Sequence, residues 1–289
     1  MILQFVITGL TVGSIYSLVA LGFCVVHNAT GIVNFAQTSF IMLGGMMMIT
    51  FLNWMHVPLA AAFLLSVLAV TVVGGLLERM AVRPARSKEP IVLIFITIGA
   101  AILMEGASMM VWGKRHMTFP SFSGDNPIHL WGATIMPQTL WIVGITVVTF
   151  AVLQMFFKYS ILGKAVRAVC ANRKAAALAG INVNRMIMLA FGMSGALGAT
   201  AGIIITPITA TSYDFGLIVG LKGFSAAILG GYGNFLGAIV GGLMLGVLES
   251  LGAGFVSSAY KDAIAFVVLL LVLFVRPRGL LGGVEAERV

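Results

Sequence analysis

Charged residues are scarce in this sequence. Only 9% of its 289 residues are Asp, Glu, Lys or Arg, whereas about a quarter of the residues of a soluble domain are charged. Hydrophobic residues make up 60% of the chain, and the mean hydropathy is +1.08. This composition excludes an ordinary soluble domain and predicts an all-α polytopic membrane protein.

Cysteine is nearly absent, and the usual motifs of catalysis are missing. Cys24 lies in an apolar run and Cys170 in a basic segment, so we expect no disulfide between them. The sequence has no Gly-x-x-x-x-Gly-Lys-Ser/Thr, no His-Glu-x-x-His, no cysteine pair at metal-ligand spacing and no nucleophile elbow. We therefore expect no catalytic residue, no metal and no cofactor in this chain, and we do not expect an enzyme.

Positive charge is concentrated in a few places. The chain has 17 Lys and Arg against 9 Asp and Glu, a net charge of +8. In a soluble protein this excess would suggest nucleic acid, but here the cations lie in short segments between apolar runs, as the positive-inside rule describes. We expect no nucleic-acid partner. Residues 78–90, residues 158–185 and the tail with Arg276 and Arg278 should be cytoplasmic.

Apolar runs long enough, or nearly so, to span about 30 Å of hydrocarbon occur throughout the chain. They lie at about residues 5–26, 32–52, 57–77, 91–112, 138–157, 186–209, 235–256 and 262–276. The charge assignment requires one more descending segment, for which we expect residues 216–231, short and glycine-broken or re-entrant. The chain is then one transmembrane domain, 1–289, with about eight transmembrane helices, an external N-terminus and a main external loop at 113–137. Alternatively, residues 27–52 do not cross fully.

The segment 158–185 is the longest interval without a bilayer-length apolar run. It carries six of the 17 Lys and Arg residues, among them Arg173, and no carboxylate. Lys164, Arg167 and Lys174 lie at positions i, i+3 and i+10, which predicts that they share one side of a helix. An ordinary positively charged connecting loop explains this composition. A docking surface for a cytoplasmic partner is the alternative.

Helix ends can be placed within this segment. Residues 176–179 continue a helical pattern, and Gly180 stands where a left-handed C-terminal cap would end it. Asn172 is a candidate N-cap for a second short helix, and Asn184 is one for the membrane helix expected to begin at Arg185. We expect one or two short helices with a basic outer side and a side of small residues.

Some polar residues lie within or between apolar runs. The turn from His27 to Gln37 is polar for its position, and an interfacial turn explains it. If it lies inside the bundle instead, Asn34 and Gln37 are buried amides that need partners, and they become candidates for a translocation pathway. Lys222 is a third candidate for that pathway.

Three charged residues lie in or beside apolar runs. They are Glu105, Lys222 and Glu249. We favour a structural role for them, in which each pairs with a polar group or extends its charge to the interface.

Glycines recur at four-residue spacing near the end of the chain. Gly233 with Gly237 and Gly242 with Gly246 form two Gly-x-x-x-Gly units. This spacing places each pair on one helix face and predicts close helix packing. A phosphate-binding loop is the weaker alternative because the Lys-Ser/Thr that completes such a loop is missing.

Five blocks of the sequence form a specific combination. They are Gly-Ile-Val-Asn-Phe-Ala-Gln at 31–37, Glu-Arg-Met-Ala-Val-Arg-Pro-Ala-Arg at 78–86, Gly-Lys-Ala-Val-Arg-Ala through Ala-Gly-Ile-Asn at 163–182, Lys-Gly-Phe-Ser-Ala-Ala-Ile-Leu-Gly-Gly-Tyr-Gly at 222–233, and Arg-Pro-Arg-Gly-Leu-Leu-Gly at 276–282. In this order they resemble the LivH-like permease subunits of bacterial branched-chain amino acid importers of the ATP-binding-cassette type, over nearly the whole chain. One departure is that Thr38 and Ser39 follow the first block, where the family usually has Gly-Glu.

The resemblance implies a transmembrane permease subunit of an ATP-driven importer for branched-chain or related amino acids, in the bacterial inner membrane. It implies that Ala176, Ala177 and Gly180 lie in the loop that docks into a groove of the cytoplasmic ATP-binding subunits, which would hold ATP and Mg. The other implied partners are a second, related permease subunit and a periplasmic substrate-binding protein. The external loop 113–137 would then face the periplasm.

A stand-alone secondary transporter or channel for a small solute is the alternative function. Glu105, Glu249 or Lys222 would then be an ion-coupling group. Such a protein would move its solute along a gradient when purified alone in liposomes, and an importer subunit would not.

Overall fold

The computed structural model describes residues 2–87, 89–130, 133–255, 257, 261–276 and 279–282, and most of these residues are helical. The elements are α1 (Ile2–Thr30), α2 (Gln37–Ile49), η1 (Thr50–Trp54), α3 (Leu59–Leu77), η2 (Glu78–Val82), α4 (Pro90–Trp112), β1 (Ile128–Leu130), β2 (Ala133–Ile135), α5 (Pro137–Tyr159), α6 (Ile161–Ala171), α7 (Arg173–Leu178), α8 (Val183–Thr209), α9 (Phe215–Gly230), α10 (Phe235–Phe255) and α11 (Lys261–Val275). The all-α membrane class expected from composition is confirmed. Arg278, expected in the cytoplasmic tail, lies outside the described residues.

Each predicted apolar run overlaps a helix. Six described helices are long and apolar enough to cross a membrane: α1, α3 continued by the π-helical turn η2, α4, α5, α8 and α10. The additional segment predicted at 216–231 is α9, which has 16 residues and is about 24 Å long at 1.5 Å per residue. It is short, as expected, but its glycines do not interrupt the helix.

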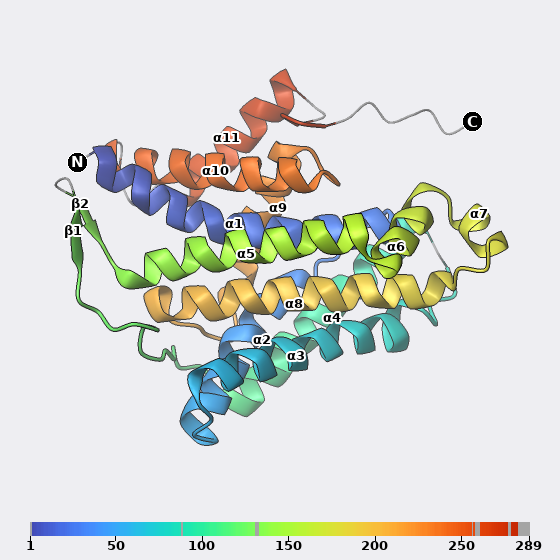
Figure 1. The fold of residues 1–289 in the computed structure, drawn as a ribbon, viewed down its shortest axis with the longest axis horizontal. Coiled ribbons are helices and arrows are strands. Elements are labelled where there is room, and N and C mark those ends of the chain that lie inside the picture. Colours follow the sequence, from blue (N-terminus) through green and yellow to red (C-terminus); the bar gives the residue numbers. More distant parts are fainter. Residues whose placement is uncertain are drawn as a thin grey trace.

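Burial separates central helices from peripheral ones. In the most apolar stretch of α1, 89% of the residues are buried, and in that of α8 the share is 72%. In α3, α4 and α5 the share is 22% each. In Figure 1, α10 runs along α1 and α3 runs along α8. The outer faces of α3, α4 and α5 carry exposed apolar side chains such as Leu64, Phe95 and Val148, as expected where lipid is the solvent.

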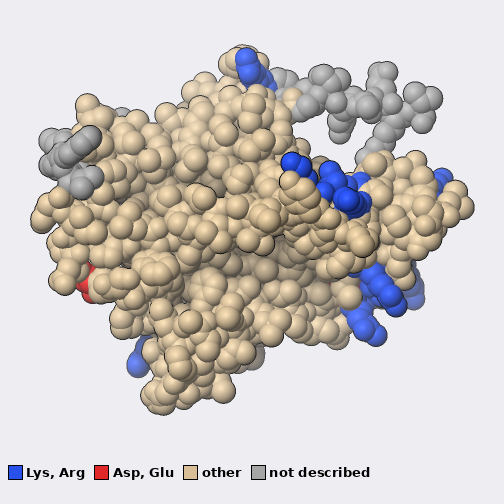
Figure 2. All heavy atoms as spheres, viewed as in Figure 1, with Lys and Arg blue, Asp and Glu red and all other residues tan. Residues whose placement is uncertain are grey.

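The two ends of the bundle differ in charge. We call the end with α6 and α7 the basic end, because Lys and Arg gather there in Figure 2. The opposite end carries the antiparallel hairpin of β1 and β2, and we call it the hairpin end (Figure 1). The start of α1 is fixed there, since Gln4 exchanges hydrogen bonds of 3.0 and 2.8 Å with the backbone of Thr134. The far end of α1 lies at the basic end, where Arg173 donates to the Ala29 carbonyl.

Two blocks that are distant in the sequence meet after α11. The backbone N–H groups of Leu280 and Leu281 donate to the carbonyls of Leu229 and Gly230, at 2.9 and 3.0 Å. Asn234 donates a side-chain hydrogen bond of 2.9 Å to the Leu281 carbonyl. The tail therefore holds the turn between α9 and α10 in place.

The second helix begins later than the apolar run predicted. Residues 31–36 are not helical, and α2 starts at Gln37 rather than near residue 32. Gly31 has a left-handed φ of 72°, and the Asn34 side chain accepts a hydrogen bond from the Ala36 backbone N–H. These local bonds replace helical ones, so hydropathy was a poor guide to this boundary.

The start of α8 also differs from the prediction. Asn184 does not cap this helix. The Asn182 side chain accepts from the Arg185 backbone N–H at 3.1 Å, and α8 begins at Val183. Both asparagines satisfy the residue preference of an N-cap, and only the backbone geometry distinguishes them.

Candidate functional site

The basic segment 158–185 folds into two short helices, α6 and α7. On α6 the inward residues are Gly163, Val166 and Val169, all buried. Lys164 and Arg167 are exposed on the outer side of the same helix. Lys174 is also exposed but lies on α7, because the extended backbone of Asn172 ends α6. The three cations are therefore all exposed but do not, as the spacing suggested, lie on one helix.

Both ends of α7 are capped. Asn172 accepts a hydrogen bond of 3.0 Å from the Ala175 N–H, as an N-cap does. Gly180 has a φ of 82°, its N–H donates to Ala177, and the Ile181 N–H donates to Ala176. This pair of bonds is a Schellman motif, which a left-handed glycine makes without strain. A six-residue helix is thus held in one conformation.

The apolar residues of α7 face in two directions. Ala176 is 4% exposed and packs against the body of the protein, whereas Ala177 is exposed. Leu178 is 91% exposed, an unusual environment for leucine outside the apolar faces of the spanning helices. Sequence reasoning missed Leu178, although a leucine next to a cap in a cationic segment was a visible signal.

Cys170 lies on the inner side of the basic segment. It is partly buried in α6, and burial raises the pKa of its thiol to about 11. At neutral pH this cysteine is therefore protonated and a weak nucleophile.

Asn34 and Gln37 are fully buried, and Gln37 lies beside the central helices. Ser194 of α8 donates to the Gln37 side-chain oxygen, and the Gln37 amide lies against Gly22 of α1. The side-chain NH₂ groups of Asn34 and Gln37 have no hydrogen-bond partner among the described residues. Unpartnered amide donors at this depth are uncommon in a folded protein.

The two residues after this turn, Thr38 and Ser39, are well packed. Ser39 donates to the Ala101 carbonyl of α4 at 3.2 Å. Thr38 lies directly against Gly216 and Gly220 of α9, where side chains on the glycines would clash with it. Both residues therefore have structural partners.

Lys222 belongs to an ionic cluster with a buried centre, not to the group around Asn34. Its ammonium lies 2.8 Å from Glu249 of α10 and 2.6 Å from Asp262 of α11. Glu249 also accepts a 2.8 Å hydrogen bond from the Tyr16 hydroxyl of α1 and lies 3.4 Å from the Lys261 ammonium. We call these five residues the ionic cluster. It joins four helices, and the only one of its members foreseen from sequence besides Lys222 is Glu249.

Glu105, the third intramembrane charge, stands apart. It is partly exposed on α4, and the described residues show no ion pair for it. The three charged residues considered together in the sequence thus divide into one coupled pair and one separate carboxylate.

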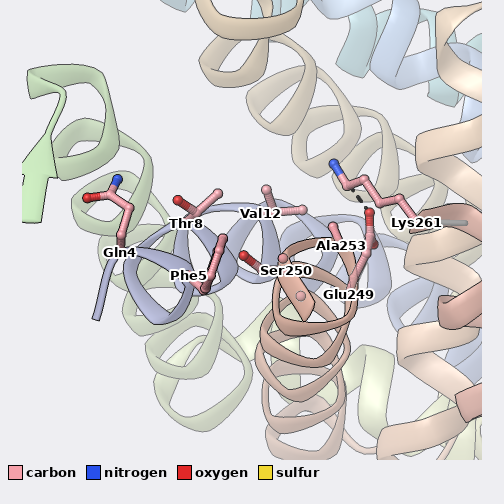
Figure 3. A pocket seen from close by; sticks show the side chains of 10 residues that line it. Gln4, Phe5, Thr8, Val12, Glu249, Ser250, Ala253 and Lys261 are labelled. Carbon is pink, nitrogen blue, oxygen red and sulfur yellow. Dashed lines mark ion pairs between the residues drawn. The ribbon is translucent and has the colours of Figure 1, made fainter. Parts of the chain in front are cut away.

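A pocket of about 250 Å³ opens beside the ionic cluster, between α1, α10 and α11. Figure 3 shows Glu249 and Lys261 next to each other at one end of it and Gln4 at the other. Phe5 and Val12 of α1 lie between them. The pocket therefore combines two opposite charges with apolar walls.

Glycines bring α1 and α10 into contact. Side chains at Gly242 or Gly246 would overlap Ser17 or Gly13 of α1, and a Cβ on Gly13 would lie 2.8 Å from the Leu243 Cα. Gly9 has the same relation to Val247, so α1 contributes its own Gly-x-x-x-Gly unit, which sequence reasoning missed.

Gly233 and Gly237, the other predicted glycine pair, do not lie on one helix. Gly237 lies on α10 and packs against Gly230 of α9. Gly233 precedes α10 in a turn with φ of 92°, and Asn234 caps the helix after it. The spacing of 233 and 237 therefore does not describe one helix face.

Known proteins resemble this chain over its whole length. A family model described as branched-chain amino acid transport system / permease component matches residues 5–273. The high-affinity branched-chain amino acid transport system permease protein LivH of Salmonella typhimurium is 34% identical, over 99% of this chain and 97% of its own. The corresponding protein BraD of Pseudomonas aeruginosa is 36% identical, over 99% and 98%.

A solved structure supports the fold. A chain of PsaBC from Streptococcus pneumoniae, in complex with Fab, superposes with a TM-score of 0.52 at 12% identity, covering 96% of this chain and 92% of its own. At this identity the likeness concerns the arrangement of helices only.

Proposed function

The chain belongs to the branched-chain amino acid transport permease family, and on this basis we propose that it is the transmembrane subunit of an ATP-driven importer for branched-chain or related amino acids. The observation that carries the proposal is the match over 5–273, together with relatives that align over 99% of the chain. The chain itself would perform no chemistry. ATP and Mg would bind to partner ATP-binding subunits, where hydrolysis would take place.

The orientation follows from charge. We assign the basic end, with 158–185, to the cytoplasm and the hairpin end, with 113–137, to the periplasm of a bacterial inner membrane. The positive-inside rule supports this orientation because the Lys and Arg residues gather at the basic end (Figure 2). A periplasmic binding protein would then deliver its amino acid at the hairpin end.

The outer surface of α6 and α7 is the proposed docking site for an ATP-binding subunit. Lys164, Arg167 and Lys174 provide exposed positive charge, and Leu178 provides an apolar anchor beside them. An exposed apolar side chain surrounded by charged residues is typical of a protein interface. Capping at Asn172 and Gly180 would present this anchor in a fixed position.

Movement of α7 would be transmitted to both central helices, α1 and α8. Arg173 connects α7 to the end of α1 through the Ala29 carbonyl, at 3.1 Å. A short turn that ends in the Asn182 cap connects α7 to α8. Closure of the ATPase could therefore bias a bundle with two arrangements, as alternating access requires.

Asn34 and Gln37 remain our candidates for the translocation pathway. The unpartnered Gln37 amide lies beside α1 and α8, the two helices that α7 would move, and the unpartnered Asn34 amide belongs to the turn that leads into α2. An arrangement in which these donors meet water or solute would satisfy them. Lys222 is a weaker candidate because two carboxylates already pair with it.

A reconstituted complex tests the function. The chain, a second, related permease subunit, the ATP-binding subunits and the binding protein are placed together in proteoliposomes. We expect ATP-dependent uptake and substrate-stimulated ATPase activity with at least one of leucine, isoleucine, valine, an aromatic amino acid and urea. The chain alone in liposomes should move none of them, and gradient-driven transport by the chain alone would instead support a secondary transporter or channel.

A further inference from the structure

We propose that the pocket in Figure 3 binds the zwitterionic head of an amino acid, with Glu249 accepting from its ammonium group and Lys261 donating to its carboxylate. This inference rests on the proposed importer function and assigns residues to its substrate. The pocket lies between α1, α10 and α11 and is separate from Asn34 and Gln37.

The charges in the pocket match those of a free amino acid. Glu249 is completely buried and lines the pocket with Lys261, whose side chain is 45% exposed. Their charged atoms lie 3.4 Å apart. A zwitterion carries the same two charges on adjacent groups, so it could exchange partners with this pair and leave no charge uncompensated.

Among the cations of the ionic cluster, Lys261 makes the weaker ion pair and would lose the least interaction energy on moving. Its distance to Glu249 is longer than the roughly 2.7–2.9 Å of a charge-assisted hydrogen bond. Lys222 is bound more closely, at 2.8 Å to Glu249 and 2.6 Å to Asp262. Solute binding would therefore displace Lys261 while Lys222 and Tyr16 continue to hold Glu249 in place.

The remaining walls suit a small apolar side chain. Phe5 and Val12 of α1 and Ala253 of α10 line the same pocket. Its volume is about 250 Å³. This space fits a single small solute and excludes a folded partner.

The pocket is also at the correct end for an imported solute. Gln4 lines it and exchanges hydrogen bonds with Thr134 in the hairpin of β1 and β2. The hairpin end is the end proposed to receive amino acid from outside. Solute in the pocket would replace the contact that Lys261 of α11 makes with Glu249 of α10. Binding would therefore change how these two helices are held together.

The first test removes one charge. Equilibrium binding of tritiated leucine is measured on the purified complex in nanodiscs without the binding protein, with isopentylamine and isocaproate as competitors. Isopentylamine lacks the carboxylate, and isocaproate lacks the ammonium. We expect Lys261→Met to weaken leucine binding by about tenfold or more, the effect of losing one charge-assisted hydrogen bond, without weakening isopentylamine.

Matched variants make this result specific. Lys261→Arg should retain leucine binding because the charge remains. Lys114→Met, which removes an exposed lysine after α4, should bind leucine as the wild type does. Equal leucine affinity in Lys261→Met and the wild type would overturn the proposal, as would a loss that affects isopentylamine equally.

The second test fills the pocket and leaves its charges intact. Ala253→Phe should reduce leucine binding by at least about tenfold while the unfolding temperature of the complex stays close to that of the wild type. Unchanged binding in a folded Ala253→Phe complex would contradict the site. If both variants bind normally and the complete system still shows ATP-driven leucine uptake, the site is wrong and the proposed function stands. If the complete wild-type system shows no such uptake of any amino acid, the function itself is wrong.

Discussion

Cations occupy two contrasting environments in this protein. On the surface of α6 and α7, Lys164, Arg167 and Lys174 are exposed in a segment without any carboxylate. In the ionic cluster, Lys222 is nearly inaccessible and lies within 3 Å of both Glu249 and Asp262. In the first region, backbone caps fix the conformation of the short helix α7, and the charged side chains remain at the surface. In the second region, ion pairs between the charged side chains hold the helices together.

This difference indicates how each region tolerates change. Removing an exposed cation at the basic end alters the surface that a partner would bind and has little effect on the stability of the fold. Removing one member of a buried pair leaves an uncompensated charge in a medium of low polarity.

The largest effect is expected for Glu249→Leu. Lys222 would keep Asp262, whose side chain is 60% exposed, as its remaining carboxylate partner, so the loss should approach but not exceed the roughly 3–5 kcal/mol of a fully broken buried pair. The measurement is the thermal unfolding temperature in detergent, together with the yield of monodisperse protein. Adding Lys222→Met to Glu249→Leu should restore much of the stability.

Glu105→Leu is the control for that prediction. It also removes a carboxylate from an apolar helix, but the described residues show no ion pair for Glu105, so stability should change little. Similar losses for Glu105→Leu and Glu249→Leu would show that the ionic cluster has no special role.

The second prediction concerns Gly180→Val. A β-branched residue at a φ of 82° is strained by about 1–2 kcal/mol, so the Schellman motif that ends α7 should distort. We expect ATP-driven uptake to be abolished while membrane insertion continues. Uptake in proteoliposomes and insertion by membrane fractionation are the measurements.

The matched control is Gly113→Val at the hairpin end. Gly113 has a φ of 78°, and at both glycines a Cβ would meet no neighbouring atom within 4 Å. Both substitutions introduce backbone strain, and Gly113 has a ψ of −165°, in a region essentially restricted to glycine, so a loss of uptake confined to Gly180→Val would reflect its location. Equal uptake in the two variants would contradict a coupling role for α7.

The third prediction separates docking from folding. Leu178→Asp should leave the unfolding free energy within about 0.5 kcal/mol, because the side chain is 91% exposed. It should lower ATP-driven uptake several-fold by removing the apolar anchor, whereas Leu178→Met should retain uptake. Normal uptake with Leu178→Asp would show that the ATPase does not use this residue.

The smallest effect concerns the inner side of α6. With its pKa at about 11, Cys170 is mostly protonated up to pH 9, so its reaction with a maleimide should be slow at pH 7.5 and rise about tenfold per pH unit. A cysteine at the exposed position in Lys164→Cys should react quickly at pH 7.5, from the cytoplasmic side only. A Cys170 rate that levels off near pH 8.5 would indicate an exposed thiol.

Local signals in the sequence were reliable for the basic end. Asn172 and Gly180 each act through backbone groups within five residues, so residue type and spacing were sufficient to place both caps. Where two asparagines were equally suitable, at 182 and 184, the sequence offered no means to choose between them.

Long-range partners were not accessible in the same way. Tyr16 and Glu249 are separated by 233 positions, and nothing in the local pattern of either indicates the other. The same is true of Ser194, which binds Gln37 from 157 positions away. Composition predicted that buried charges and amides need partners, but only the packing of helices could identify them.

The position of α1 has a consequence for biosynthesis. This helix is made early and becomes the most enclosed of the spanning helices, yet its glycine face and Tyr16 meet α10 only after more than two hundred further residues have been translated. Until then, lipid or the insertion machinery must cover that face. Ribosome stalling before α10 should therefore leave a nascent chain whose first helix is inserted while the face that packs against α10 is not yet covered by it.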